Sequence, residues 1–238
     1  MTTDHLFSRY YYSTPDFVDG TTRFHSLCAR YIPRAGAILE IGPGPSNPTS
    51  EYLRSFGAVT GVDVSAEAAT NSALTSAIVY NGRQFPFDGN SFHACVSNYV
   101  LEHVEDPALH FREVARILKP GGVYCFRTPN LWHYVTLASK LTPHRFHTLL
   151  ANRLRKLCEA HDPYPTFYRA NTRRTLARLC RAAGLLPASI STIEAEPSYG
   201  RCHPLCFFPM MLYERLVNRT RTLQCLRMNI FAVMTKTA

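Results

Sequence analysis

An acid, two glycines and a second acid lie close to one another in the first third of the chain. Glu40 interrupts the apolar run 38–41, and Gly42 and Gly44 follow it directly. A buried strand, a glycine turn and a helix N-terminus form a nucleotide-binding crevice at the carboxyl end of a parallel sheet. Asp63 follows the first glycine by about 20 residues, the spacing of a carboxylate that binds ribose hydroxyls. These residues predict a site for a nucleoside.

Simpler explanations exist for each of these residues. A glycine-rich turn is often only a tight turn, and Glu40 could be an ordinary acid that faces a helix. An acid inside an apolar strand is costly unless it is used, which favours a functional role for Glu40. A nicotinamide dinucleotide is disfavoured, because Asn47 stands where that fingerprint has Gly or Ala.

The elements around the turn alternate between strands and helices. We expect strands at about 37–41, 58–62, 77–80, 93–97 and 123–127, with helices over 21–32, from Ser65 and from Asp106 to Leu118. This alternation predicts a parallel, doubly wound α/β sheet. After Asn130 it stops, and we expect a helix over 172–183, a strand over 188–195, a helix over 210–218 and a last strand over 228–235.

Length and composition set broad limits. A chain of 238 residues can bury one α/β core with inserted lobes. No apolar run reaches the roughly 18 residues that span a bilayer, and the N-terminus does not have the pattern of a secretory signal. The eight cysteines lack framework spacing, so we expect reduced thiols in a cytoplasmic protein.

The positive charge is concentrated in the second part of the chain. Residues 1–138 hold 10 Lys and Arg against 12 Asp and Glu, whereas residues 139–238 hold 16 against 5. A basic half suits an anionic substrate, nucleic acid or a membrane surface, and a solvated arginine-rich surface explains it equally well.

Seven short motifs in a fixed order carry a resemblance to a known family. They are Leu39-Glu40-Ile41-Gly42-Pro43-Gly44, Val62-Asp63, Phe85-Pro86-Phe87, Ser91-Phe92, Ser97-Asn98, Leu101-Glu102-His103-Val104 and Leu118-Lys119-Pro120-Gly121-Gly122. Together they resemble the class I S-adenosylmethionine-dependent methyltransferases, specifically the type 11 group. The resemblance implies a Rossmann-like, doubly wound seven-stranded sheet, parallel with one antiparallel strand. Helices would cover both faces, with helical insertions after strand 5 and between strands 6 and 7.

The resemblance also implies S-adenosylmethionine as the cofactor and a role for each matching residue. Glu40 is expected near the methionine amino end. The backbone around Gly42 and Gly44 would pass close to the sugar and the amino-acid portion, and Asp63 would accept both ribose hydroxyls.

A second group of residues would hold the adenine and the methyl end. Val64 would pack on adenine, and Gly82 would donate its backbone N–H to the ring. Asn81 stands where the family often has Asp, and its amide oxygen would accept from the adenine amino group. Asn98 and Tyr99 would line the wall near the methyl group.

Transfer to a hydroxyl or an amine also needs a group that takes a proton. His103 and His133 are the predicted catalytic residues, with Glu102 and Tyr134 as weaker candidates. A simple hydrogen bond in the loop explains His103 equally well. Tyr134, His144 and Arg145 are expected to bind the acceptor, and no metal is expected.

The whole of 1–238 is expected to form one methyltransferase domain. An N-terminal arm over 1–20 and insertions over 131–170 and 197–225 would form a substrate lid. The acceptor would be a small polar or anionic molecule, methylated at O or N in biosynthesis. The alternatives are a cofactor-binding module without transfer activity, or transfer to a membrane lipid or to nucleic acid, the last being disfavoured for lack of an acceptor motif.

The apolar run 205–213 also leaves two alternatives open. Arg215, Arg219 and Arg221 follow it. The run could pack on the sheet edge, which is the more common arrangement, or it could lie on an anionic membrane as a peripheral contact. The oligomeric state is not predicted.

Overall fold

The computed structural model describes residues 2–141 and 164–237, and within them the chain divides into two compact units. The first, here called the sheet unit, comprises Phe24–Pro129, Thr166–Ser191 and Ile230–Ala238. The second, here called the helical unit, comprises Met1–Arg23, Asn130–Pro165 and Thr192–Asn229. Each unit is described by itself.

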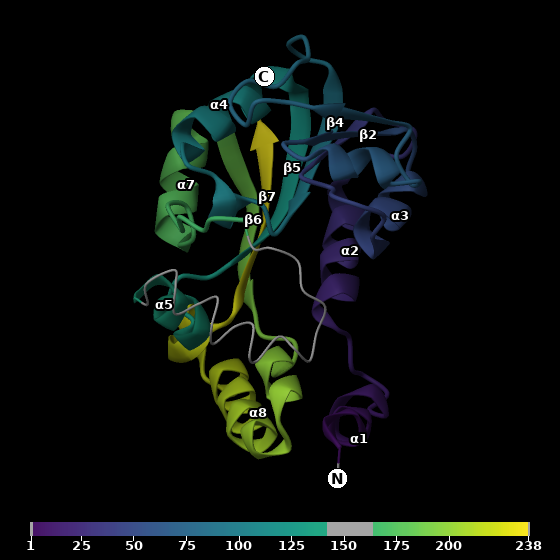
Figure 1. Cartoon of the computed structure of the whole chain (residues 1–238). Helices are drawn as coiled ribbons and strands as arrows, with labels where there is room; N and C mark the ends of the chain where they lie inside the picture. Colours follow the sequence, from purple (N-terminus) through teal and green to yellow (C-terminus); the bar gives the residue numbers. More distant parts are fainter. Residues whose placement is uncertain (1, 142–163, 238) are drawn as a thin grey trace. The chain divides into compact units, whose positions relative to one another are not determined.

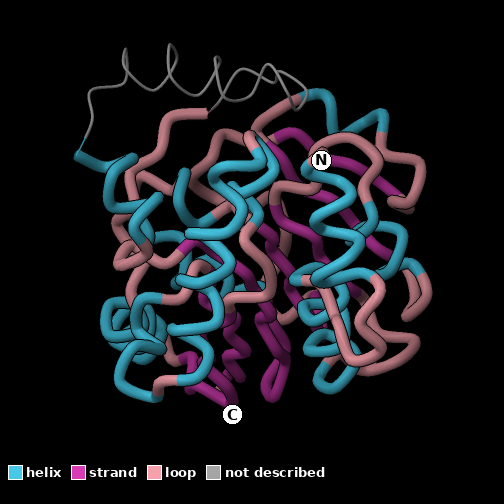
Figure 2. The backbone as a smooth tube through the Cα atoms, turned by 90° about the horizontal axis from the view of Figure 1, so that it is seen from below, coloured by secondary structure: helices cyan, strands magenta, loops and turns pink. Residues whose placement is uncertain are grey.

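A seven-stranded sheet forms the centre of the sheet unit (Figures 1 and 2). Its strands are β1 (Ile38–Ile41), β2 (Val59–Asp63), β3 (Ser76–Val79), β4 (Phe92–Asn98), β5 (Leu118–Pro129), β6 (Leu185–Ile193) and β7 (Asn229–Lys236). Their order is β3-β2-β1-β4-β5-β7-β6, and the first five pair in parallel. Figure 1 shows β7 running opposite to β5. The predicted Rossmann-like sheet is therefore confirmed.

Helices cover both faces of this sheet (Figure 1). They are α2 (Gly20–Tyr31), α3 (Pro48–Arg54), α4 (Pro107–Ile117) and α7 (Arg173–Ala182), with short 3-10 turns η2 (Ala66–Thr70) and η3 (Leu101–His103). The start of α4 follows from its sequence, because Asp106 accepts from Leu109 N at 3.0 Å and Pro107 occupies the first turn. Its buried face, which includes Phe111, Val114 and Ile117, packs in the core.

The helical unit is built mainly from short helices. They are α1 (Thr3–Phe7), the π-helical turn η1 (Ser8–Tyr12), α5 (Tyr134–Leu141), the 3-10 turns η4 (Ser198–Cys202) and η5 (Arg221–Leu226), and α8 (Pro204–Arg219). Leu6, Phe7, Tyr11 and Phe207 form its small apolar core. The N-terminal arm is therefore helical over 3–12 and packs against α8. Across the described ranges 2–141 and 164–237, no helix combines the length and apolarity that crossing a bilayer requires.

The residue ranges of the helical unit overlap those of the expected arm and insertions, except at the end of the first insertion. Residues 166–170, the last part of the expected insertion 131–170, belong to the sheet unit, and the bounds of the insertion stay a prediction. Hydrogen bonds hold this segment there: the backbone of Phe167 donates to Glu102 O at 2.7 Å, and Asn171 Nδ2 donates to Pro129 O at 3.0 Å. The role of these segments as a lid stays a prediction.

Candidate functional site

The glycine turn after β1 has the conformation that glycine alone adopts easily. Gly42 and Gly44 have φ values of +66° and +59°. A Cβ on Gly42 would lie 2.6 Å from Val100 Cγ2, so packing also requires glycine there. A Cβ on Gly44 would meet nothing within 4 Å. The backbone at Gly44 therefore faces open space, as a turn that a ligand approaches closely must.

Asp63 ties this turn to the carboxyl end of β2. Its Oδ2 accepts from Gly44 N at 2.9 Å, and its Oδ1 accepts from Ser65 N at 2.9 Å. Each carboxylate oxygen keeps a second lone pair, so Asp63 can also accept from two neighbouring hydroxyls. The structure thus brings together Gly44 and Asp63, which are 19 positions apart in sequence.

Glu40 has a buried carboxylate oxygen in need of a partner. The residue is 3% exposed on β1, and burial raises its pKa to about 7, against a smaller opposite effect of a hydrogen bond from Ser50. Within the described part of the chain, Glu40 Oε2 has no hydrogen-bond partner. A buried polar atom left in this state is costly, so the site suits a ligand that brings a cation or a donor.

Val64 and Gly82 form a second surface, next to Asp63. Val64 is 51% exposed although it is apolar. Gly82 has a φ of +75°, and a Cβ there would lie 3.4 Å from Val64 Cγ1. An apolar side chain beside an accessible stretch of backbone suits a flat ring that stacks on one and bonds to the other.

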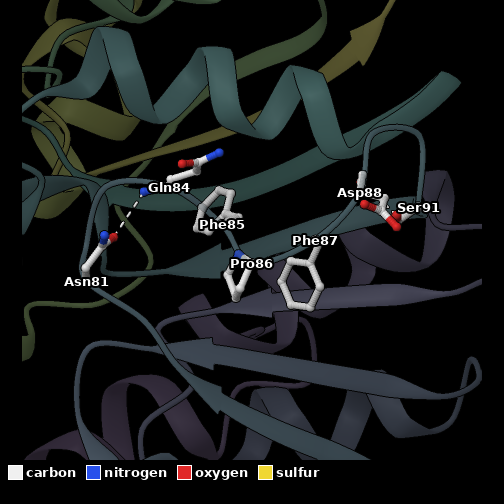
Figure 3. Close-up of a pocket in the computed structure, with 7 residues that line it drawn as sticks. All are labelled: Asn81, Gln84, Phe85, Pro86, Phe87, Asp88 and Ser91. Carbon is white, nitrogen blue, oxygen red and sulfur yellow. Dashed lines mark hydrogen bonds between the residues drawn. The ribbon is translucent and has the colours of Figure 1, made fainter.

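Asn81 makes two hydrogen bonds within the turn that follows β3. Its Oδ1 accepts from Arg83 N at 2.9 Å. It also accepts from Gln84 N at 3.2 Å (Figure 3). Both lone pairs of the amide oxygen are thereby used in this conformation. Asn often closes a turn in this way.

A shallow pocket follows the same segment but is not the predicted cofactor crevice. It is lined by Asn81, Gln84, Phe85, Pro86, Phe87, Asp88 and Ser91 (Figure 3), and shares only Asn81 with the predicted cofactor residues. Arg116 donates to the carbonyls of Phe85 and Phe87, and Glu113 accepts from Phe85 N. The Phe85-Pro86-Phe87 motif is therefore held by α4.

Asn98 and Tyr99, at the end of β4, are held by an arginine that was not among the predicted site residues. Arg127 on β5 is 6% exposed, and its Nε donates to Asn98 Oδ1 at 2.6 Å. Its guanidinium also lies 4.4 Å from the centre of the Tyr99 ring, and Tyr99 has a φ of +59°. Asn98 Nδ2 donates in turn to Thr49 Oγ1 at 3.0 Å. An arginine inside an apolar strand was the signal, since arginine is rarely buried without a partner.

Comparison with known proteins identifies the central part of the chain. The family model described as a methyltransferase domain, type 11, matches residues 39–126. Residues 39–126 form a type 11 methyltransferase domain. Among curated relatives, the demethylmenaquinone methyltransferase of Corynebacterium kroppenstedtii is 28% identical over 65% of this chain and 70% of its own length. That of Corynebacterium glutamicum is 34% identical over 39% of this chain and 42% of its own length.

A further curated relative and two solved structures are also methyltransferases. The ubiquinone biosynthesis O-methyltransferase of Ralstonia nicotianae is 27% identical over 71% of each chain. The S-adenosylmethionine-dependent methyltransferase of Mesorhizobium loti superposes with a TM-score of 0.59 at 14% identity, over 92% of this chain and 98% of its own. The geranyl diphosphate C-methyltransferase of Streptomyces coelicolor, solved with S-adenosylhomocysteine, gives 0.57 at 19% identity, over 91% and 78%. The two structures show that the fold is shared.

S-adenosylmethionine is the cofactor of this methyltransferase domain, and the residues present fit it. The orphaned oxygen of Glu40 suits the ammonium group, and the open backbone at Gly44 suits close approach. The exposed Val64 provides an apolar surface beside them. The amide oxygen of Asn81 bonds within its own turn, and its contact with adenine stays a prediction.

Two proton acceptors lie in one 3-10 turn of the methyltransferase domain, directly after β4. Glu102 is 4% exposed, and burial raises its pKa to about 7. Thr128 Oγ1 donates to its Oε2 at 3.1 Å, and Asn171 Nδ2 donates to Thr128 Oγ1 at 2.7 Å. His103 follows in the same turn and is half-buried. Its catalytic role stays a prediction.

His133, the other predicted catalytic residue, lies in the helical unit and is 1% exposed. Its Nε2 is 3.8 Å from Glu194 Oε2; burial lowers the pKa of His133 to about 4 and raises that of Glu194 to about 8. A neutral imidazole thus faces a carboxyl that mostly keeps its proton at neutral pH. A base must contact its substrate, and His133 is buried in this structure, so its catalytic role stays a prediction.

The remaining predicted acceptor residues differ in what the structure says of them. Tyr134 is 38% exposed, and its ring centre lies 4.3 Å from that of His133 and 4.8 Å from that of Tyr213. His144 and Arg145 lie outside the described residues. The contribution of all three to acceptor binding stays a prediction.

Proposed function

We propose that this chain transfers the methyl group of S-adenosylmethionine to an oxygen or nitrogen atom of a small polar or anionic molecule. The observation that carries the proposal is the buried, unpartnered carboxylate oxygen of Glu40 at the end of β1, beside the open Gly44 turn. When bound, the cofactor supplies an electrophilic methyl group on a sulfonium, so the protein mainly provides orientation and desolvation.

The residues of the sheet unit then have distinct tasks. Glu40 holds the ammonium group, and Asp63 accepts from the ribose hydroxyls while it fixes Gly44 N. Asn98, held by Arg127 and by Thr49, forms a rigid wall at the methyl end. A wall fixed by two side-chain hydrogen bonds keeps the reacting groups aligned at little further cost in entropy.

Acceptor atoms such as hydroxyl oxygen and amine nitrogen must lose a proton on methylation. Glu102, with its pKa raised to about 7 by burial, is close to half ionised at neutral pH, which suits a group that takes up a proton. His103 lies beside it in the same turn. Two groups of this kind after β4 support an O or N acceptor, because carbon and thiol acceptors need less assistance.

The names of the relatives indicate which acceptors to test first. Two are called demethylmenaquinone methyltransferases and one a ubiquinone biosynthesis O-methyltransferase. Hydroxylated benzoquinone and naphthoquinone precursors are therefore the first compounds to offer this chain. They have ionisable ring hydroxyls, which agrees with a polar or anionic acceptor.

The test is methyl transfer from isotopically labelled S-adenosylmethionine to these compounds and to a fractionated metabolite extract. We expect label in a small molecule, at O or N as located by mass spectrometry, with less transfer by Asp63→Ala at a cofactor concentration that does not saturate the variant. Binding of the cofactor without label in any fraction would instead indicate a cofactor-binding module. Label in nucleic acid or phospholipid would contradict the proposed acceptor class.

A further inference from the structure

Four large apolar side chains of α8 lie in solvent along one line of the helix. Leu205, Phe208, Leu212 and Leu216, here called the apolar stripe, are 79%, 47%, 69% and 52% exposed. Their spacing of three, four and four residues places them on one face of a helix. A contiguous exposed apolar face of this kind usually marks a site of interaction.

The opposite face of α8 already holds the helix in its unit. Phe207 is 0% and Val217 is 1% exposed. Glu214, 9% exposed, accepts from Tyr11 Oη at 3.0 Å and from Asn218 Nδ2. The apolar stripe is therefore not needed to attach α8 to the helical unit, and its exposure needs another explanation.

Cationic side chains lie close to the apolar stripe in sequence and along α8. Arg215 and Arg219 are exposed on α8, each three residues after a leucine of the stripe. The only acid of α8 is Glu214, which points into the unit. At the other end, Phe208 contacts the ring of Tyr10, and the Arg9 guanidinium lies 5.6 Å from that ring. Cationic side chains thus flank the apolar stripe at both ends.

We infer that α8 lies on the surface of an anionic phospholipid bilayer. The apolar stripe would enter the boundary between headgroups and acyl chains, and Arg215 and Arg219 would contact lipid phosphates. The 16 residues of α8 correspond to a length of about 24 Å, shorter than the roughly 30 Å hydrocarbon core, so the helix lies in the membrane plane. This inference does not rest on the proposed function.

Charge favours the bilayer over a second copy of the chain. In a two-fold symmetric contact the same patch meets itself, so the arginines that flank the apolar stripe would face like charges. An anionic lipid surface complements both the apolar and the cationic parts of the face.

The test is cosedimentation with vesicles of pure phosphatidylcholine and of phosphatidylcholine with about 30% phosphatidylglycerol, an anionic content in the range where basic residues respond. We expect the full chain to bind the anionic vesicles, and to release on raising the salt concentration. Leu212→Asp should lower the bound partition by roughly tenfold or more. Leu186→Asp is the matched control, because Leu186 is 50% exposed on β6, and it should leave binding unchanged.

Three results would overturn the inference. They are no binding to either vesicle, equal binding to neutral and anionic vesicles, and equal losses for Leu212→Asp and Leu186→Asp. A dimer in sedimentation velocity that Leu212→Asp abolishes would assign the face to a second copy instead. A circular dichroism spectrum and a melting curve like those of the wild type verify that Leu212→Asp is folded. Unchanged binding of S-adenosylhomocysteine by this variant separates the outcome from a failure of the proposed function.

Discussion

At the scale of single residues, the state of Glu40 couples cofactor binding to pH. Burial raises its pKa to about 7, so below that pH the free protein must release a proton before the carboxylate pairs with an ammonium group. We predict that affinity for S-adenosylmethionine rises about tenfold per pH unit up to about pH 7. Above about pH 8 it falls, as the ligand α-amino group loses its proton. Calorimetry from pH 5.5 to 8.5 checks this, and a flat profile would contradict it.

The burial of Glu40 also predicts that Glu40→Gln stabilises the folded protein. The folded pKa of Glu40 lies above its unfolded value, so the folded state loses stability as the pH rises from about 4.5 to about 7. Glu40→Gln removes that loss, so without ligand it should exceed the wild type by about 1–3 kcal/mol at pH 8 and by little at pH 5. Urea unfolding at both values measures the difference. A less stable variant at pH 8 would show that burial of the charge is not costly.

Residues at strand ends were predictable from sequence, whereas side-chain partners were not. Gly44 and Asp63 meet, and Glu40 lies on the neighbouring strand, because parallel strands bring their carboxyl ends to one edge of the sheet. The role of Arg127 depends on Asn98, 29 positions away in sequence, and no local pattern encodes that pairing. The hydrogen bond of Asn81 Oδ1 with Arg83 N belongs to a turn, and the contact of Asn81 with adenine stays a prediction.

At the scale of elements, two neighbouring residues of α8 separate its inner face from its outer face. Phe207 is 0% exposed and packs with Leu6, Phe7 and Tyr11, whereas Phe208 is 47% exposed. We predict that Phe207→Ala costs about 3–4 kcal/mol, and Phe208→Ala less than about 1 kcal/mol. Hydrogen exchange should show that Phe207→Ala also loosens α1. Similar losses for both variants would mean that α8 is not held as described.

Two elements, α8 and β5, begin earlier in the chain than the sequence pattern predicts. The helix expected over 210–218 begins at Pro204, where His203 accepts from Leu205 N at 3.2 Å and proline occupies the first turn. β5 begins at Leu118 rather than near 123, in spite of Pro120 and two glycines. The strand continues there because Phe92 of β4 pairs with Leu118 and supports the irregular start.

At the scale of the whole molecule, the two units predict separable effects on binding and on transfer. Every predicted cofactor residue lies in the sheet unit, whereas Tyr134 lies in the helical unit. We predict that Tyr134→Ala lowers methyl transfer about tenfold or more, with cofactor affinity changed less than about threefold. Single-turnover rates and calorimetry give the two quantities. A parallel loss of both would place Tyr134 in cofactor binding, and a loss of neither would remove it from the acceptor site.

The central claim is that the edge formed by β1 and β2 binds S-adenosylmethionine through Glu40, Gly44 and Asp63. Calorimetric titration of the wild type and of Asp63→Ala with S-adenosylhomocysteine and with NAD tests it most directly. We predict binding of S-adenosylhomocysteine in clear preference to NAD, and a loss of about 2–3 kcal/mol in Asp63→Ala, because paired hydroxyls lose a charged acceptor. Tighter binding of NAD, or unchanged affinity in a variant with a normal melting curve, would contradict the claim.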